Sequence, residues 1–219
     1  MRKQAFEEIY SQHKWGGVSK SGPGSDPHAT KEYVKFINNF LQDNINIKSI
    51  VEIGCGDWAT TRLLKFPTDY SYLGYDIVSS VIEENTRQFG GKKTRFICAD
   101  FMSSEIETGD LILIKDVLQH LSNDVVNTFI NNILPKYKVA IITNDVKKYR
   151  QKLFFGIPLI KRKYQTPNLD ILDGKSRPLE IDKSPFMLDI ARKFRYKNIF
   201  QQGNELAVFI KEVCVWYNK

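Results

Sequence analysis

Five short apolar runs alternate with helical patterns in this chain, and that alternation limits its fold more than any other feature. The runs cover residues 49–53, 72–75, 94–98, 110–114 and 139–143, with helical patterns near 59–65, 78–88 and 124–134. Strands that are apolar throughout and separated by helices are typical of a parallel sheet covered on both faces. Two further runs, 196–201 and 206–216, are separated only by the turn sequence QGNE. The sequence therefore predicts an α/β fold whose mostly parallel sheet ends in an antiparallel strand.

The 219 residues suffice for one domain with a sizeable core. We expect this domain to span residues 30–219 and to begin with a helix capped by Thr30. Residues 1–29 are rich in Gly, Ser and Pro around positions 15–27 and are interpreted as a loop, either a flexible linker or a lid that orders over a ligand. Residues 146–185 contain four prolines and no clean period, which predicts an insertion over the ligand face, before a last helix.

The net charge of +7 favours anionic partners such as nucleic acid, phosphorylated sugars or acidic lipid surfaces, although a lysine-rich proteome explains it equally well. No run approaches the roughly 20 apolar residues of a membrane span, and the N-terminus is too polar for a signal peptide. The three cysteines have no metal-ligand spacing, so we expect buried free thiols and no metal site. These features predict a cytoplasmic protein.

A glycine turn follows the first apolar run, in the sequence SIVEIGCGDWA at residues 49–59. A strand that ends in glycines before a helix points free backbone N–H groups at a ligand. GCGDWA fits the dinucleotide pattern G-x-G-x-x-A, and Asp76 ends the second run, where an acid can bind ribose hydroxyls. Glu52 inside the turn and Asp100 after the third run would oppose a pyrophosphate. They favour a positively charged ligand that contains ribose and adenine.

From residue 30 to 219 the chain resembles the class I S-adenosylmethionine-dependent methyltransferases. The segments VEIGCGDWA, YLGYDIV, FICADF and DLILIKDVLQHL resemble that family's first four motifs, in the same order and spacing. The resemblance implies a Rossmann-like seven-stranded sheet in the order 3-2-1-4-5-7-6, with strand 7 antiparallel and helices on both faces. Trp58 departs from the family, which often has a third glycine there. Its ring either contacts cofactor or substrate or belongs to the core.

Carried over residue by residue, the resemblance assigns S-adenosyl-L-methionine to one rim of the sheet. The residues expected at the methionine part are Glu52, Gly54, Cys55, Gly56 and Lys115. The residues expected at the ribose and adenine are Asp76, Ile77, Asp100 and Phe101. Either of the two aspartates could instead cap the helix that follows it.

A narrower resemblance links WGGVSKSGPGS, IITND and SRPLEIDKSPF to a bacterial subgroup of sugar or polysaccharide O-methyltransferases. This resemblance implies that Trp15, Ser19 and Ser25 fold over the cofactor. It also implies that Arg177 approaches the active site and contacts substrate. The tetrapeptides NPPY and DPPY, which the family's amine methyltransferases often carry after strand four, are absent, and their absence favours an oxygen acceptor.

Methylation of a hydroxyl requires a base that removes its proton, and substrates of open α/β sheets lie beyond the carboxyl ends of the strands. His120 is the predicted base, since histidine titrates near neutrality. Asp116, four residues earlier, would orient His120 or bind substrate if both lie on one helical face. Asp145 is the rival base, and Asn144 is expected to hydrogen-bond substrate. The alternative is that His120 only packs a helix onto the sheet.

The run from Lys147 to Lys163 has basic residues at both ends and an apolar centre at residues 153–160. It is interpreted as substrate-loop or core packing, as a peripheral membrane contact through Leu153, Phe154 and Phe155, or as a nucleic-acid contact. We predict an O-methyltransferase for a sugar or glycan precursor, free or lipid-linked, in the cytoplasm or at the inner membrane face. The alternatives are a nucleic-acid or protein methyltransferase, a non-catalytic S-adenosylmethionine-binding module and an NAD-dependent enzyme.

Overall fold

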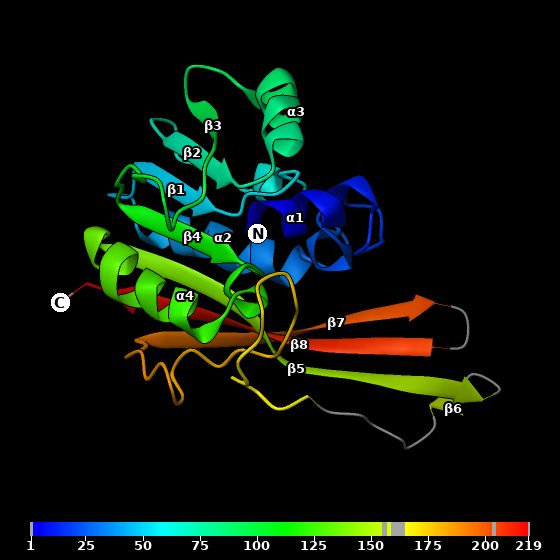
Figure 1. The fold of residues 1–219 in the computed structure, drawn as a ribbon. Helices are drawn as coiled ribbons and strands as arrows, with labels where there is room; N and C mark the ends of the chain where they lie inside the picture. The colour runs from blue at the N-terminus through cyan, green and yellow to red at the C-terminus, as the bar shows by residue number, and fades with distance from the viewer. Residues whose placement is uncertain (1, 155–156, 159–164, 203–204, 219) are drawn as a thin grey trace.

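Figure 1 shows a mixed β-sheet with helices on both faces, in a computed structural model that describes residues 2–154, 157–158, 165–202 and 205–218. The strands are β1 (Ser49–Ile53), β2 (Ser71–Asp76), β3 (Thr94–Cys98), β4 (Leu111–Lys115), β5 (Val139–Phe154), β6 (Ile157–Pro158), β7 (Arg192–Gln202) and β8 (Glu205–Tyr217). Their order is β3-β2-β1-β4-β5-β8-β7, and the short β6 pairs with the end of β5. Only β8 runs antiparallel to its neighbours β5 and β7 in this seven-strand path. The predicted order 3-2-1-4-5-7-6 is therefore confirmed.

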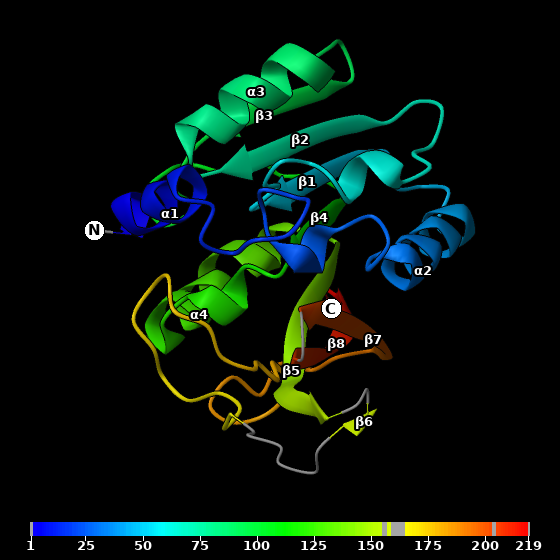
Figure 2. The same cartoon turned by 90° about the vertical axis from the view of Figure 1, so that its right-hand side faces the viewer.

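Side chains of the central strands point alternately into two hydrophobic cores, one on each face of the sheet. Val51, Ile112 and Ile114 pack on the face covered by α4 (Asn123–Thr128). Ile50 and Leu113 pack on the opposite face, which α2 (Lys31–Asp43) and α3 (Ser79–Phe89) cover. Figure 2 shows α2 and α4 on opposite sides of the sheet. Strands that are apolar at every position fit this double coverage.

Two predicted helices differ from the observed backbone. Residues 59–65 form only a short 3₁₀ turn at Thr61–Leu63, because the glycine turn before it keeps left-handed φ angles, including 56° at Trp58. The helix predicted at 124–134 is α-helical only to Thr128 and continues as a π turn, Phe129–Ile133, and a 3₁₀ turn, Leu134–Lys136. The helix after Thr30 forms as predicted, but the Thr30 hydroxyl donates to the Asp26 carbonyl and caps nothing.

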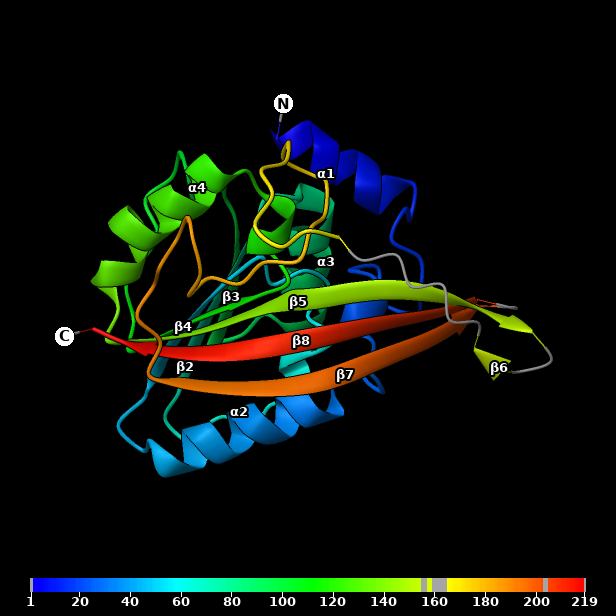
Figure 3. The ribbon, with the colours of Figure 1, turned by 90° about the horizontal axis from the view of Figure 1, so that it is seen from below.

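Strands β5, β7 and β8 extend far beyond the other strands, as Figures 1 and 3 show. The pairing of β4 with β5 ends at Lys115 and Thr143, whereas β5 stays paired with β8 as far as Lys152 and Glu205. We call residues 146–154, 197–202 and 205–210 the arm. The predicted irregular insertion at 146–185 is thus wrong for its first nine residues (146–154), and described residues 165–191 contain no last helix. The side chains of residues 150–164, which the membrane hypothesis requires, lie outside the described part of the chain.

The first 29 residues are more regular than the predicted loop. They contain helix α1 (Arg2–Ser11) and a 3₁₀ turn at Pro23–Ser25. Cys98 is exposed, contrary to the expected burial of all three thiols, while Cys55 and Cys214 are buried. Among the described residues, no helix is both long and apolar enough to cross a membrane.

Candidate active site

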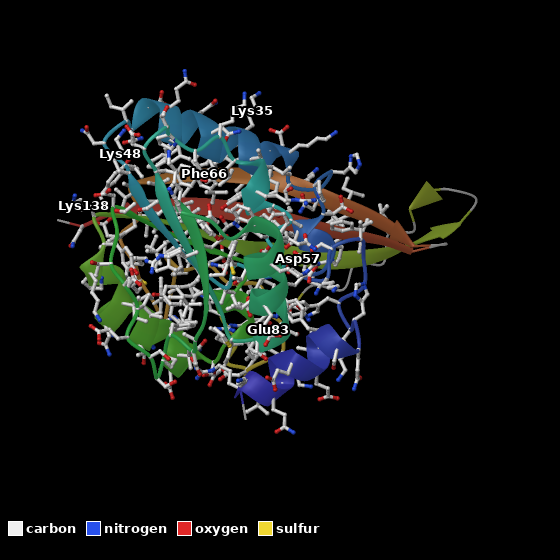
Figure 4. All side chains as sticks on the ribbon, turned by 90° about the horizontal axis from the view of Figure 1, so that it is seen from above. Lys35, Lys48, Asp57, Phe66, Glu83 and Lys138 are labelled. Carbon is white, nitrogen blue, oxygen red and sulfur yellow. The ribbon has the colours of Figure 1, made fainter. Side chains whose placement is uncertain are left out.

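A cavity of about 340 Å³ lies at the carboxyl ends of the parallel strands, where the strand order reverses between β1 and β4. Such a switch point is the usual ligand crevice of open α/β sheets, and small-molecule pockets measure roughly 300–1,000 Å³. Figure 4 shows Asp57, beside the glycine turn, on the side from which the arm projects, with Lys48 and Lys138 at the opposite end. The cavity wall combines these strand ends with α1, the turns that follow it and the base of the arm.

Two buried carboxylates at adjacent strand ends are fixed by hydrogen bonds. Asp76 accepts hydrogen bonds from the backbone N–H groups of Gly56 and Val78, both at 3.0 Å, and burial raises its pKa. Glu52 accepts a 2.9 Å bond from the Thr61 hydroxyl and a second from the Tyr72 hydroxyl. Burial raises the pKa of Glu52 to about 7. Within the described residues Glu52 has no ion pair, so a bound cation would stabilise its ionised form.

The glycine turn requires its glycines because other segments pack directly on its backbone. A Cβ at Gly54 would lie 2.2 Å from the Val117 side chain, and one at Gly56 would lie 2.2 Å from Ser21 Oγ. Both glycines also have positive φ angles, 70° and 53°. The predicted cofactor residues Cys55, Ile77 and Phe101 line the same cavity as these glycines.

The N-terminal segment closes one side of the cavity through charged and aromatic contacts. Nη1 of Arg2 donates to both oxygens of Asp100, at 2.9 and 3.1 Å, and Nε donates to Asp173 at 2.7 Å. The Trp15 ring lies 5.4 Å from the His120 ring, and Ser25 also lines the cavity. The sequence did not predict Arg2, because nothing distinguishes it from a charged residue at a solvent-exposed helix end.

Ser19 holds the N-terminal segment from outside the cavity wall. Its hydroxyl is buried and hydrogen-bonds to Asp57, with the nearer carboxylate oxygen at 2.8 Å. The Ser21 hydroxyl donates to Asp57 as well, at 3.0 Å. These bonds fasten the segment to the glycine turn.

Four alternating charges form a buried network at the other side of the cavity. Lys211 donates to Asp116 at 2.6 Å and to Asp145 at 2.8 Å, and Lys115 donates to Asp116 at 2.6 Å. Burial by itself would raise the pKa of Asp116, but the two ammonium groups outweigh it and lower that pKa to about 2. The same two carboxylates raise the pKa of Lys211 against its burial. Lys211 was not predicted, although a lone lysine in the apolar run of β8 is a signal for it.

His120 lies at the cavity wall, and one of its ring nitrogens is hydrogen-bonded to the backbone. Its Nδ1 is 2.8 Å from the Lys175 carbonyl oxygen, and because a carbonyl can only accept, Nδ1 carries the proton. Nε2 therefore keeps its lone pair and accepts a long, 3.5 Å hydrogen bond from the side-chain amide of Gln119. That amide is fixed by Asp145, whose backbone N–H donates to Gln119 Oε1 at 2.6 Å. Burial lowers the pKa of His120, which keeps the ring neutral at pH 7.

The predicted pairing of Asp116 with His120 is wrong. Asp116 has a φ of 58° and precedes a 3₁₀ turn, Leu118–His120, so the two residues share no helical face. The oxygens of Asp116 bind Lys115 and Lys211 instead, and the Lys175 carbonyl orients the imidazole.

Three residues predicted to contact substrate lie outside the cavity wall. Trp58 is buried in the core, where its ring packs on Tyr72, Phe89 and Phe96. Arg177 donates to the Leu121 carbonyl at 2.6 Å and to Asn123 at 2.8 Å, which fastens the loop that carries Lys175. Asn144 is buried, and its side-chain oxygen has no hydrogen-bond partner among the described residues.

Comparison with known proteins finds a family similarity over part of the chain. Residues 51–134 match the family model described as "Methyltransferase domain", whereas a comparison with curated proteins gives no match. This segment is therefore similar to a methyltransferase domain, whose cofactor is S-adenosylmethionine.

Solved structures share the fold at low sequence identity. Magnesium protoporphyrin IX methyltransferase from Synechocystis PCC 6803 with bound SAM aligns at a TM-score of 0.57 and 14% identity, covering 97% of each chain. Its complex with SAH aligns at 0.56 and 13%, covering 97% of this chain and 99% of that chain. TehB from Haemophilus influenzae aligns at 0.55 and 12%, covering 89% of this chain and 67% of that chain. At these identities the likeness shows the fold alone.

The residues present fit this cofactor. S-adenosylmethionine carries a sulfonium and an ammonium group, and the cavity offers the buried carboxylates of Glu52 and Asp76 beside a glycine turn. Asp100 lies on the same rim. The raised pKa of Glu52 marks a carboxylate that a neighbouring cation would stabilise.

Proposed function

We propose that this protein is an O-methyltransferase that uses S-adenosylmethionine to methylate a hydroxyl group of a sugar or glycan precursor. The observation that carries the proposal is His120, a neutral imidazole at the cavity whose Nδ1 is bonded to a backbone carbonyl and whose Nε2 lone pair accepts a long, 3.5 Å hydrogen bond from the Gln119 amide, which a substrate hydroxyl would replace. A hydroxyl acceptor needs such a base, whereas a neutral amine attacks without one.

The roles of the surrounding residues follow from their contacts. The cofactor supplies an electrophilic methyl group on a sulfonium. His120 Nε2 accepts the hydroxyl proton, and the resulting imidazolium is stabilised by the negative charges of Asp116 and Asp145. Trp15, beside the imidazole ring, helps to exclude water.

For the cofactor itself, we propose that Asp76 holds the ribose hydroxyls and that Glu52 and Lys115 face the methionine end. Asp100, with Ile77 and the backbone of Phe101, would bind the adenine. The Asp76 carboxylate is already oriented by Gly56 and Val78, so little side-chain entropy is lost on binding.

Substitution of Asp76 by alanine should weaken the binding of S-adenosylhomocysteine by about 10- to 100-fold, because hydrogen bonds to a charged group are each worth about 1.5–3 kcal/mol. Isothermal titration calorimetry measures this directly. Asp69→Ala, which removes an exposed carboxylate from a distant loop, is the matched control and should bind like the parent. Equal affinity of the two variants would disprove the ribose assignment.

The affinity for S-adenosylhomocysteine should fall by about tenfold per pH unit below pH 7, because the ammonium group favours ionised Glu52, whose pKa in the free protein is about 7. Binding in that range then releases a proton, which calorimetry in buffers of different ionisation enthalpy detects. Glu52→Gln should bind with little pH dependence between pH 5 and 7, and a parent-like pH profile in this variant would contradict the assignment.

The free protein should show the opposite trend in stability. The folded pKa of Glu52 lies above its ordinary value of 4.5, so its contribution to stability is complete below pH 4.5 and is lost as the pH rises through 7. Urea unfolding of the cofactor-free parent and of Glu52→Gln between pH 5 and 8 separates this effect from binding.

The proposed activity is tested with S-adenosylmethionine carrying a ¹³C-labelled methyl group. Separate incubations contain nucleotide sugars, lipid-linked sugars, RNA and protein extract, and NMR identifies the atom that receives the label. A methoxy signal on a sugar supports the proposal. Label on nitrogen, or only on RNA or protein, would overturn it, and cofactor binding without any transfer would favour a binding module.

A further inference from the structure

We propose that the arm forms the acceptor-binding wall of the cavity, with Lys148 binding a phosphate ester and the rings of Phe200 and Phe209 packing against the sugar that carries it. The inference rests on the proposed function, because it names the acceptor class of the same site.

The strand register places these three residues on one face of the arm. Lys148 lies opposite Phe209, and Phe200 lies opposite Ala207, two residues from Phe209 on β8. Because side chains alternate along a strand, Phe209 shares its face with Lys211. Lys211 bonds to Asp116 and Asp145, so this face continues the buried charge network outward. All three arm residues line the cavity.

The aromatic pair offers a surface suited to a sugar ring. The Phe200 and Phe209 centroids are 5.6 Å apart with the rings at 73°, and both side chains are half-buried. The C–H groups of a pyranose ring can be buried against such faces, with the hydroxyls directed to polar neighbours. Ser176 and His120 line the same cavity and supply polar partners.

The charge distribution separates the arm end from the cofactor end. Glu52 and Asp76 make the cofactor end negative, while Asp116 and Asp145 are compensated by Lys115 and Lys211.

Lys148 places a further ammonium group at the arm end, with Nζ 5.0 Å from the centre of the Phe209 ring. Lys148 and His120 both line the cavity, and the positive charge of Lys148 lowers the pKa of His120. Lysine binds phosphate as a compact point charge.

The binding test uses the protein saturated with S-adenosylhomocysteine and titrated with inorganic pyrophosphate. Lys148→Met should weaken pyrophosphate binding by about 10- to 100-fold. Lys147→Met is the matched control, because it removes the same charge from the opposite face of β5 and should stay within about twofold of the parent. Equal pyrophosphate affinities of the two variants, or no binding by the parent, would overturn the inference.

The sugar contact is tested with a uridine diphosphate hexose and a polyprenyl diphosphate hexose in detergent micelles. Phe209→Leu should raise the Kd for these sugars by about tenfold and leave pyrophosphate binding unchanged. Preference for one of the two acceptors distinguishes a soluble from a lipid-linked source. Equal binding of neutral methyl hexosides would count against the phosphate site. Failure of the proposed function is recognised separately, as the absence of any methoxy product.

Discussion

Replacement of His120 by glutamine should lower kcat by about 10²- to 10⁴-fold, the usual contribution of a positioned general base. The affinity for S-adenosylhomocysteine should change little, because the carboxylates assigned to the cofactor lie on other strand ends. Steady-state transfer assays with the acceptor found by ¹³C labelling, combined with calorimetry, separate the two quantities. The exposed His28 provides a control, since His28→Gln removes an imidazole without touching the cavity.

The pH profile gives His120 a signature that a packing role would not produce. The base must be neutral, and burial holds its pKa below the ordinary 6.5. The value of kcat should therefore be level at pH 7 and fall as the pH drops below 6.5. The His120→Gln variant should lose this decrease of kcat at low pH as well as most of its rate. If the variant loses rate but its kcat still decreases at low pH, the proton is transferred to another group, and Asp145 is the first candidate.

The central sheet could be predicted because its strands are buried on both faces. Ile50 and Val51 point to opposite cores, so an apolar residue is required at every position and the run is visible in the sequence. The arm lacks this signal. Between Asn144 and Lys152, strand β5 is held by its pairing with β8. Its charged residues there, including Lys147 and Lys148, break the apolar pattern by which a strand is recognised in the sequence.

In the candidate site, the sequence predicts which residues lie at strand ends, but it does not predict which side chains they bind. Asp76 ends β2, which lies beside the switch-point strand β1, so the topology places it near the cavity. The partner of Asp116 depends on a left-handed backbone angle, which redirects its carboxylate away from His120 and toward Lys115. Lys211 reaches the site only because β8 lies beside β5, a register that no local pattern in β8 specifies.

Replacement of Lys211 by methionine should lower the free energy of unfolding at pH 7 by about 3–5 kcal/mol, the usual cost of removing one member of a buried ion pair. Lys211 is 2% exposed and holds both Asp116 and Asp145. Its loss removes the ammonium group from Asp145, which keeps a hydrogen bond from the Gln119 amide at 3.3 Å. Urea unfolding monitored by circular dichroism measures the change. The exposed Lys197 is a matched control, and Lys197→Met should cost no more than about 0.5 kcal/mol.

The pH dependence of that loss tests whether charge pairing, rather than packing, is its cause. In the parent the pKa of Asp116 is lowered to about 2 from 3.8, so the pairing stabilises the fold above pH 3.8 and is lost as the pH falls through 2. The difference between parent and Lys211→Met should therefore be largest near neutrality and shrink below pH 4. Addition of Asp145→Asn to the variant should recover part of the loss at pH 7, because it removes the orphaned charge. A difference that is constant with pH, with no recovery in the double variant, would mean that the lysine side chain contributes through its packing alone.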